Sequence, residues 1–558
     1  MKKPIVAGAD THLLPVKAQG GYDGASRMNR ELMSWSPPVT SADGALLHGK
    51  DMADARMADA ERNDGYIHGA LNTHKDSVVG SAFRLNAKPD WKTLGLDETW
   101  AREFQSFVEN WFTLYAESPE NWLDARRERT FTGLVRLAIG SAFLAGESLS
   151  SAEWIRSAAR PYKTAIQMID PVRLSNPDGQ ADGPGLRKGI YRNTFGEAIR
   201  FAIREAVPSD IFARDSWRWK LVDARKPWGR KQILYYFDAN RIDQSRGIAD
   251  LVSALKGTKM AAKYKDVVLQ NAVLNATYAA SIESELPTAE VFASLGYQNT
   301  GTDTDVMSAW AINTLDAIAA YTGNSNNLLL DGVQVPHLYP GTKLRLQNAG
   351  QPGGVGTGFE ESLLRYTAAS LGMSYEEISQ DFTKTNYSSF KAAGLNTHKR
   401  MMARKKTIAD AFASDVFRLV FEEAFNAGDF KDVLPAGAPS IYDRFMLDAY
   451  TRCAWIGASR GQVDELKETN AAIARIKAGI STYEKECAKF GEDYREVFRQ
   501  RYREQVEAKE MGLVLDLSNG GGGTVDAGGG AVDKAPKGTV NKDPKPNDPN
   551  QQDNQQGG

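Results

Sequence analysis

The chain has 558 residues, too many for one small core, and this length predicts two to four subdomains. Hydrophobic residues make up 42% and charged residues 25%, which is typical of a soluble globular protein. Lysine plus arginine total 68 against 70 aspartate plus glutamate, a formal net charge of −2. Proteins that hold DNA through many phosphate contacts are usually basic, so the composition argues against a static DNA binder.

Two further classes are disfavoured by sequence pattern. No stretch approaches eighteen apolar residues, and the apolar run after Met1 ends by Asp10, so we expect neither a membrane span nor a signal peptide. The two cysteines, Cys453 and Cys487, lie far apart and in no metal-binding spacing, which indicates buried or bystander thiols in a reducing compartment. We therefore expect no metal and no cofactor.

The first third of the chain predicts an extended arm followed by helices. Residues 1–50 are rich in Gly, Pro and Ser, with isolated apolar anchors such as Trp35. A helical pattern follows in residues 50–87. Asp97 is placed to cap a helix with a wide aromatic stripe, and Thr130 to begin another. The stripe consists of Trp100, Phe104, Phe107, Trp111 and Tyr115.

Residues 165–237 change to short runs between turn clusters. The runs at residues 165–169, 190–192, 198–203 and 232–237 predict β-strands joined by hairpins. Helices followed by strands indicate an α+β fold.

The middle of the chain predicts two helices around a mixed region. Residues 247–280 carry one long helical pattern. Residues 281–357 predict a helix at 304–321, strands at 327–330 and 343–346, and a flexible Gly-rich return at 351–358. A helix then runs from Phe359 to Gly372, which stops it.

A polar segment at residues 380–389 separates that helix from a much longer one, an arrangement that also fits an ordinary surface hairpin. The longer helix starts near Ser388, and its core stripe is Ile408, Phe412, Val416 and Leu419. Residues 462–477 are amphipathic. Ser481 and Glu484 form a predicted capping box for a helix that ends before Gly512. Its expected core side is Tyr483, Cys487, Phe490, Tyr494, Val497 and Phe498, and residues 519–558 predict a disordered tail.

The motifs that carry chemistry are weak. GASRG at residues 457–461 matches the G-x-S-x-G nucleophile elbow, with Ser459 as nucleophile. In α/β-hydrolases the catalytic histidine follows the serine, and none of the six histidines follows Ser459. The glycines at 353–358 lack the Lys-Ser/Thr of a phosphate-binding loop, and no Walker A motif is present. His68 and His74, six apart, fall on different sides of a helix. We expect no enzyme activity.

The main basic cluster is HKRMMARKK at residues 398–406. It has two interpretations. One is a solvated helix face. The other is contact with DNA or with acidic neighbours, for which Glu376, Glu377 and Asp381 just upstream are candidates across subunits.

Several stretches together resemble one family. FEESLLRYTAASLGMSYEEIS at residues 359–379 resembles the signature stretch of the lambda-type family of tailed-phage portal proteins. Seven more stretches match in order over roughly residues 30 to 510. They are WSPP at 35–38, RNDGY at 62–66, VGSAFRL at 79–85, RTFT at 129–132, IESEL at 282–286, PHLYPG at 336–341 and STYEKECA at 481–488.

The resemblance implies a portal-type α+β subunit in a ring, normally of twelve, around a DNA channel at one capsid vertex. The implied regions are an arm (1–50), a wing (51–246), a stem helix (247–280), a mixed α/β clip (281–357), a second stem helix (358–372), a tunnel loop (373–390), a long wing helix (391–439), a helical crown (440–518) and the tail (519–558).

The resemblance also implies partners and a site. The tunnel-loop residues expected to face DNA are Asp381, Lys384, Asn386, Tyr387 and Lys391. Expected partners are identical subunits, double-stranded DNA, the terminase large subunit, the major capsid protein, the scaffold and head-tail connector proteins, with no membrane. The expected location is the virion vertex, and the host cytoplasm during assembly. The alternatives are a minor capsid or tail-baseplate component, or a serine hydrolase using Ser459.

Overall fold

The computed structural model describes residues 22–25, 29–207, 209–210, 215–277, 327–330, 333–336, 352–459 and 465–513. The chain divides into two compact units, Met1–Val497 and Phe498–Gly558. The predicted tail, the helix at 304–321 and the strand at 343–346 lie outside the described residues. Of the predicted clip, the structure describes strands β9 (Asn327–Leu330) and β10 (Val333–Pro336), an antiparallel pair.

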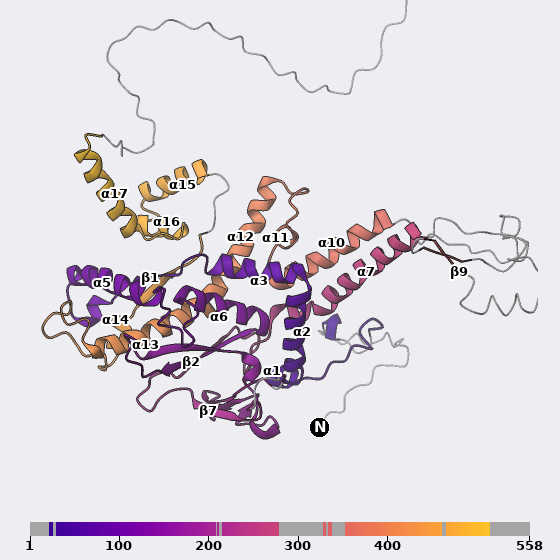
Figure 1. Ribbon diagram of the computed structural model, residues 1–558, viewed down its shortest axis with the longest axis horizontal. Helices are drawn as coiled ribbons and strands as arrows, with labels where there is room; N and C mark the ends of the chain where they lie inside the picture. Colours follow the sequence, from indigo (N-terminus) through magenta and orange to yellow (C-terminus); the bar gives the residue numbers. More distant parts are fainter. Residues whose placement is uncertain are drawn as a thin grey trace, which may run out of the picture. The chain divides into compact units, whose positions relative to one another are not determined.

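Helices form most of residues 42–145 (Figure 1). They are α1 (Ala42–Leu46), α2 (Lys50–Asn63), α3 (Gly65–Val78), α4 (Trp91–Leu94), α5 (Glu98–Ala116) and α6 (Phe131–Ala145). The predicted caps are confirmed, because Asp97 accepts the N–H of Thr99 and the Thr130 hydroxyl accepts the N–H of Gly133. The arm is not extended throughout, since Ser41 caps α1 through the N–H of Gly44.

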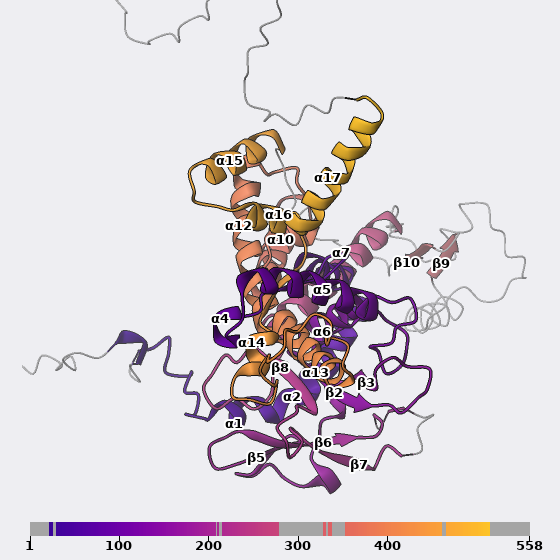
Figure 2. The same ribbon diagram turned by 90° about the vertical axis from the view of Figure 1, so that its left-hand side faces the viewer.

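Two antiparallel sheets lie below α5 and α6 in the view of Figure 2. The first has the order β3-β2-β8, from Thr164–Ile169, Glu147–Trp154 and Ile233–Phe237. The second has the order β4-β5-β6-β7, from Leu186–Arg187, Ile190–Arg192, Ala198–Arg204 and Trp219–Asp223. All four predicted strands are present. The sequence missed β2 because its first six residues, ESLSSA, are buried on both faces and show no alternation.

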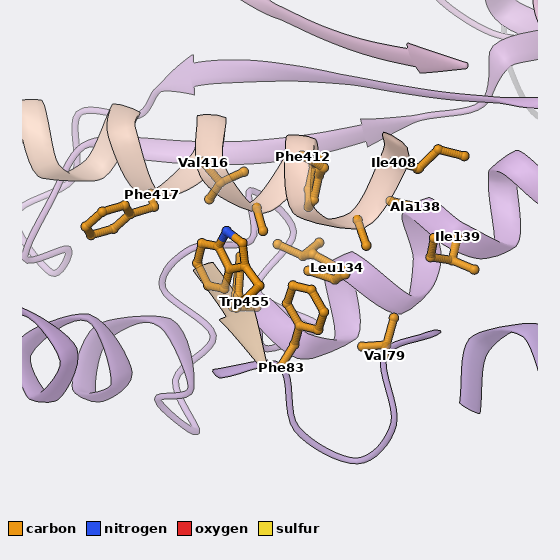
Figure 3. Packing of buried hydrophobic residues seen from close by; sticks show 14 of the residues in the cluster. Val79, Phe83, Leu134, Ala138, Ile139, Ile408, Phe412, Val416, Phe417 and Trp455 are labelled. Atoms are coloured by element: carbon orange, nitrogen blue, oxygen red, sulfur yellow. The ribbon is translucent and has the colours of Figure 1, made fainter. Parts of the chain in front are cut away.

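The main hydrophobic core lies between α3, α5, α6 and α13 (Ala411–Ala427). Figure 3 shows Leu134 and Ala138 of α6 facing Phe412 and Val416. A smaller core between the two sheets contains Leu149, Ile169, Leu174, Ile190, Phe201, Ile203 and Ile233.

Two strands that are far apart in sequence pack against the main core. Strand β1 (Arg84–Ala87) pairs antiparallel with β11 (Cys453–Ile456). The ring of Trp455 stacks on Phe83 with 5.6 Å between centroids, which places both inside the main core. Residues 453–456, which the prediction placed in a helical crown, form a strand packed against the main core.

The predicted stem consists of α7 (Leu255–Thr277) and α10 (Pro352–Leu371), which lie side by side (Figure 1). Tyr264 contacts Phe359 edge-on at 5.4 Å, and the hydroxyls of Thr258 and Thr367 lie 3.2 Å apart. The first helix begins eight residues later than predicted, after a 3-10 turn at Asp250–Ser253. The return predicted to be flexible at 351–358 is instead helical from Pro352, while Gly372 (φ 73°) ends α10 as predicted.

The long helix contains a local irregularity. It runs as α12 (Tyr387–Arg404), a π-helical turn (Lys405–Asp410) and α13. Buried Lys405 donates to the Asp410 carboxylate at 2.6 Å and to the Trp455 carbonyl at 2.8 Å. The predicted stripe is confirmed, since Ile408, Phe412, Val416 and Leu419 are all buried, and the helix stops at Gly428.

The C-terminal helices differ from their prediction. They are α14 (Met446–Tyr450), α15 (Glu465–Lys477), α16 (Tyr483–Lys489) and α17 (Tyr494–Glu510). The capping box is wrong, because Thr482 caps α16 and Ser481 instead donates to Glu486 at 2.6 Å. The expected single helix breaks at Gly491 (φ 77°). Its expected core residues Tyr483 and Phe490 are 53% and 45% exposed.

A buried ionic cluster joins α2, β2 and the residues before the stem. Glu147 is fully buried, and the Arg246 Nε lies 3.0 Å from both of its carboxylate oxygens. The Lys50 ammonium lies 3.4 Å from Glu147 and 2.7 Å from Asp54. Burial raises the pKa of Glu147, but Arg246 and Lys50 outweigh it and hold that pKa below its ordinary value. For Asp54 burial prevails, and its pKa rises to about 6.

Glu147→Gln should lower the free energy of unfolding by about 3 to 5 kcal/mol, because it leaves the Arg246 guanidinium buried without a counter-charge. Urea denaturation at one fixed protein concentration measures this. The control is Asp223→Asn, which breaks the exposed Arg200–Asp223 pair and should cost less than about 1 kcal/mol. Equal losses for the two variants would contradict the role given to the buried cluster.

The raised pKa of Glu109 should make the free energy of unfolding depend on pH. Glu109 accepts hydrogen bonds from the Ala87 N–H and the Gln105 amide, and burial raises its pKa to about 7. The carboxyl ionises more readily unfolded, near its ordinary value of 4.5, so its contribution to stability falls as pH rises from about 4.5 to 7. Glu109→Gln should remove this part of the pH dependence in denaturation curves, and an unchanged slope would contradict the assignment.

Candidate functional site

The predicted tunnel loop is a small folded hairpin between α10 and α12. Its first part is α11 (Tyr375–Ser379), which begins with a reciprocal capping box between Ser374 and Glu377. Glu377 also accepts the Thr397 hydroxyl at 2.6 Å, and this bond ties α11 to α12. The buried side chain of Ile378 anchors α11. The Ser-x-x-Glu pattern at residues 374–377 is a local signal for this helix start, and the prediction of a loop over residues 373–390 missed it.

Residues 380–386 form the exposed part of the hairpin. Gln380 has a left-handed backbone (φ 55°), which ends α11. One oxygen of the Asp381 carboxylate accepts the Thr383 N–H at 3.0 Å and the Thr383 hydroxyl at 2.6 Å, and these bonds lower its pKa. Phe382 contacts Phe390 edge-on at 5.3 Å. Asp381 therefore shapes a turn as well as lying on the loop.

Both predicted loop cations are paired with carboxylates of the same chain. Exposed Lys384 forms an ion pair with Glu361 of α10, and that hydrogen bond raises the pKa of Lys384. Lys391, on α12, lies 3.1 Å from Glu468 of α15. Nothing in the local sequence indicated either carboxylate, because the partners lie 23 and 77 residues away.

The other two predicted residues lie where α12 begins. Asn386 is the N-cap, and its side-chain oxygen accepts the Ser389 N–H at 2.9 Å. Tyr387 is the first residue of α12. The structure thus places Asp381, Lys384, Asn386 and Tyr387 together in one hairpin, with Lys391 just inside the helix that follows.

The basic cluster at 398–406 matches neither interpretation in full. Arg404 forms an ion pair with Asp250 and donates to the His74 Nδ1 at 3.0 Å, while Lys405 is buried. Burial, followed by the Arg404 charge, lowers the pKa of His74 to about 3, so the ring is neutral and accepts this bond. Arg400 donates to the Ala369 carbonyl at 3.2 Å. These cations join α12 to α3, to the 3-10 turn before α7 and to α10. Lys399 and Lys406 are exposed.

Ser459 is exposed beyond the end of β11. Ser459 and His398 line the same small cavity, of about 180 Å³. The order expected of α/β-hydrolases concerns only histidines that follow Ser459, and His398 precedes it. Glu377 also lines this cavity, but Thr397 and the Ser374 N–H already occupy its Oε2. A second carboxylate of the cavity, Glu468, lies 3.1 Å from the Lys391 ammonium. Both acids of the cavity are therefore engaged with other groups.

Metal sites and membrane spans are both missing from the part of the chain that the structure describes. There, no group of three or more His, Cys, Asp or Glu side chains is arranged to hold a metal ion. Among the same residues, no helix combines the length and apolar character needed to cross a membrane.

The model of the family described as "Phage portal protein, lambda family" matches residues 28–405, more than half of the chain. The chain belongs to the lambda family of phage portal proteins. Portal protein B of Escherichia phage lambda is 35% identical over 511 residues, covering 91% of this chain and 94% of the relative. The portal protein of Escherichia phage N15 is 34% identical over 513 residues, covering 92% and 95%.

The resemblance stated above is therefore confirmed, as are the α+β portal-type fold and the function of a phage portal protein. Among solved structures, the chain is similar to one from the neck of an empty GTA particle computed with C6 symmetry. That similarity has a TM-score of 0.37 and 12% identity, and covers 80% of this chain and 94% of the other.

Asn386→Ala should destabilise the start of α12 by about 1 kcal/mol, because it removes the side-chain acceptor for the Ser389 N–H. Hydrogen exchange of the amides at residues 388–390 measures the fraying, which should speed up severalfold. Asn386→Ser, which keeps a capping oxygen, is the matched control and should exchange nearly as the native protein does. Equal exchange in the alanine variant would contradict the capping role.

Proposed function

We propose that this portal protein assembles as a closed ring, of twelve subunits as the family resemblance implies, through which double-stranded DNA passes during packaging and ejection. In this proposal α7 and α10 are the stem, the α11–α12 hairpin is the tunnel loop, and the chain acts as a conduit and not as an enzyme.

The observation that carries the proposal is the apolar surface of the two stem helices. Five large apolar side chains on α7 and α10 are 45% to 65% exposed in the single chain: Met260, Val267, Leu269, Phe359 and Tyr366. Apolar side chains gathered on one helix pair indicate a protein contact. Head-to-tail contacts between identical subunits cover such surfaces when the rotation closes a ring.

The charges of the hairpin fit a surface past which DNA moves. Lys384 and Lys391 are each paired with a carboxylate, Glu361 and Glu468. A phosphate must compete with that carboxylate, so each contact with DNA is weak and sensitive to salt. Weak contacts favour sliding over arrest.

We place the protein at the portal vertex of the virion, and in the host cytoplasm during assembly. The proposed partners are the terminase large subunit during packaging, the major capsid protein and scaffold at the vertex, and head-tail connector proteins afterwards. The regions given above from the family resemblance, from arm to tail, belong to this proposal, with β11 assigned to the wing.

Ring assembly is tested with stem variants of the full-length chain. Met260→Glu with Val267→Glu places charges seven residues apart on the exposed side of α7 and should convert the ring to small species in gel filtration and negative-stain images. Gln270→Glu, an exposed charge on the same helix, should leave the ring intact. A native protein that stays monomeric at micromolar concentration would overturn the proposal.

The loop is tested separately with Lys384→Gln, which removes one exposed charge and should cost no more than about 0.5 kcal/mol of stability. Rings should form normally, whereas the amount of DNA packaged or retained in a phage assembly assay should change. Lys399→Gln, an exposed lysine of α12, is the matched control. Identical packaging by the native protein and both variants would remove Lys384 from the DNA path without affecting the ring.

A further inference from the structure

A groove on the wing, away from the hairpin and the stem, combines apolar walls with positive charge. It has a volume of about 410 Å³ and lies between α6, the end of β3 and residues 124–129. Its apolar wall consists of Leu134, Leu137, Leu144 and Met168, of which all but Leu134 are half-buried. These three side chains remain partly open to water, so the wall is available for contact.

Three cations line the same groove, namely Lys75, Arg126 and Arg129. In the part of the chain that the structure describes, neither Lys75 nor Arg126 forms an ion pair. The carboxylates near Lys75 are engaged elsewhere, since Glu61 binds His68 at 2.9 Å and Asp76 binds Arg136 at 2.7 Å. Arg129 forms an ion pair with its exposed neighbour Glu128, at 2.7 Å.

Two carboxylates, Asp124 and Asp170, line the groove beside these cations. Asp124 is 2% exposed, and its carboxylate accepts the backbone N–H groups of Arg126, Glu128 and Arg129 at 3.0 to 3.1 Å. Asp170 accepts the N–H of Val172 at 3.0 Å. Both carboxylates hold backbone turns in shape. The groove lining therefore carries three cations against two carboxylates, of which Asp124 is buried and Asp170 is exposed.

Lys75 lies along α6 because Gly140 leaves room for it. A Cβ atom at Gly140 would lie 2.7 Å from the Lys75 Cε. Burial, and then the charge of Arg136, lowers the pKa of Lys75. An anionic ligand would relieve this repulsion, and the leucines beside the ammonium favour a ligand that also has apolar side chains.

We propose that this groove binds an acidic, apolar peptide segment of a partner protein, with its carboxylates on Lys75, Arg126 and Arg129 and its apolar side chains on the α6 wall. The paired N–H donors of an arginine side chain match the two oxygens of a carboxylate. The apolar wall on α6 favours a peptide over DNA, because DNA phosphates would contact the cations and leave the wall uncovered. The inference does not rest on the proposed conduit function.

The test uses the full-length protein and a fluorescent peptide of alternating leucine and glutamate pairs, followed by anisotropy. The native protein should bind it, and Arg126→Glu with Arg129→Glu should weaken binding by roughly tenfold or more, as expected for losing two charge-assisted contacts. Arg56→Glu, an exposed charge reversal on α2, is the control and should bind normally. The same peptide with glutamine for glutamate should bind poorly.

Other results assign the groove differently and overturn the proposal. No binding of the acidic peptide by the native protein would do so. A short DNA duplex that binds in the native protein but not in the double variant, while the peptide does not bind, would make the groove a phosphate site. Loss of ring assembly in the double variant, again without peptide binding, would make it a contact between subunits.

Discussion

The Glu147–Arg246 pair is the constraint on which the arrangement of the two sheets depends. A fully buried carboxylate needs a matched cation, and Arg246 supplies one while its remaining donors reach the carbonyls of Pro171, Leu174 and Lys188. These contacts bring both sheets to the segment that leads into the stem. The approach is so close that a Cβ atom on Gly247 would lie 2.1 Å from the Gly146 carbonyl oxygen, so glycine is required there.

A continuous set of contacts leads from this pair to the hairpin. Four residues beyond Arg246, Asp250 binds Arg404 at the end of α12. The predicted stem helices α7 and α10 then join through Thr258 and Thr367, and α10 packs against α11 of the hairpin. The hairpin is thus positioned by the wing at one end and by the stem at the other. This explains how an exposed, polar loop keeps a defined place beside the proposed channel.

The net charge of the chain is only −2, although we propose that the protein surrounds DNA. Pairing of cations with carboxylates of the same chain is consistent with this near-neutral charge. In the hairpin and along α12, Lys384, Lys391 and Arg404 bind carboxylates of the same chain, and Arg400 binds a carbonyl group. The wing groove differs, since Lys75 and Arg126 form no ion pair in the part of the chain that the structure describes. These two cations line the groove for which we propose a protein partner, away from the proposed DNA path.

The sequence by itself determined the family, the α+β class and those elements whose signals are local, such as the cap at Asp97 and the helix stop at Gly372. Only the tertiary structure decided which distant groups meet. The pairing of β1 with β11 and the carboxylate partners of Lys384 and Lys391 join residues that no short-range pattern connects. The wrong cap at Ser481 has the same cause. Ser481 and its neighbour Thr482 are both good N-cap residues. In the structure Glu486 binds Arg475 and also accepts the Ser481 hydroxyl, so Thr482 is the residue that caps α16.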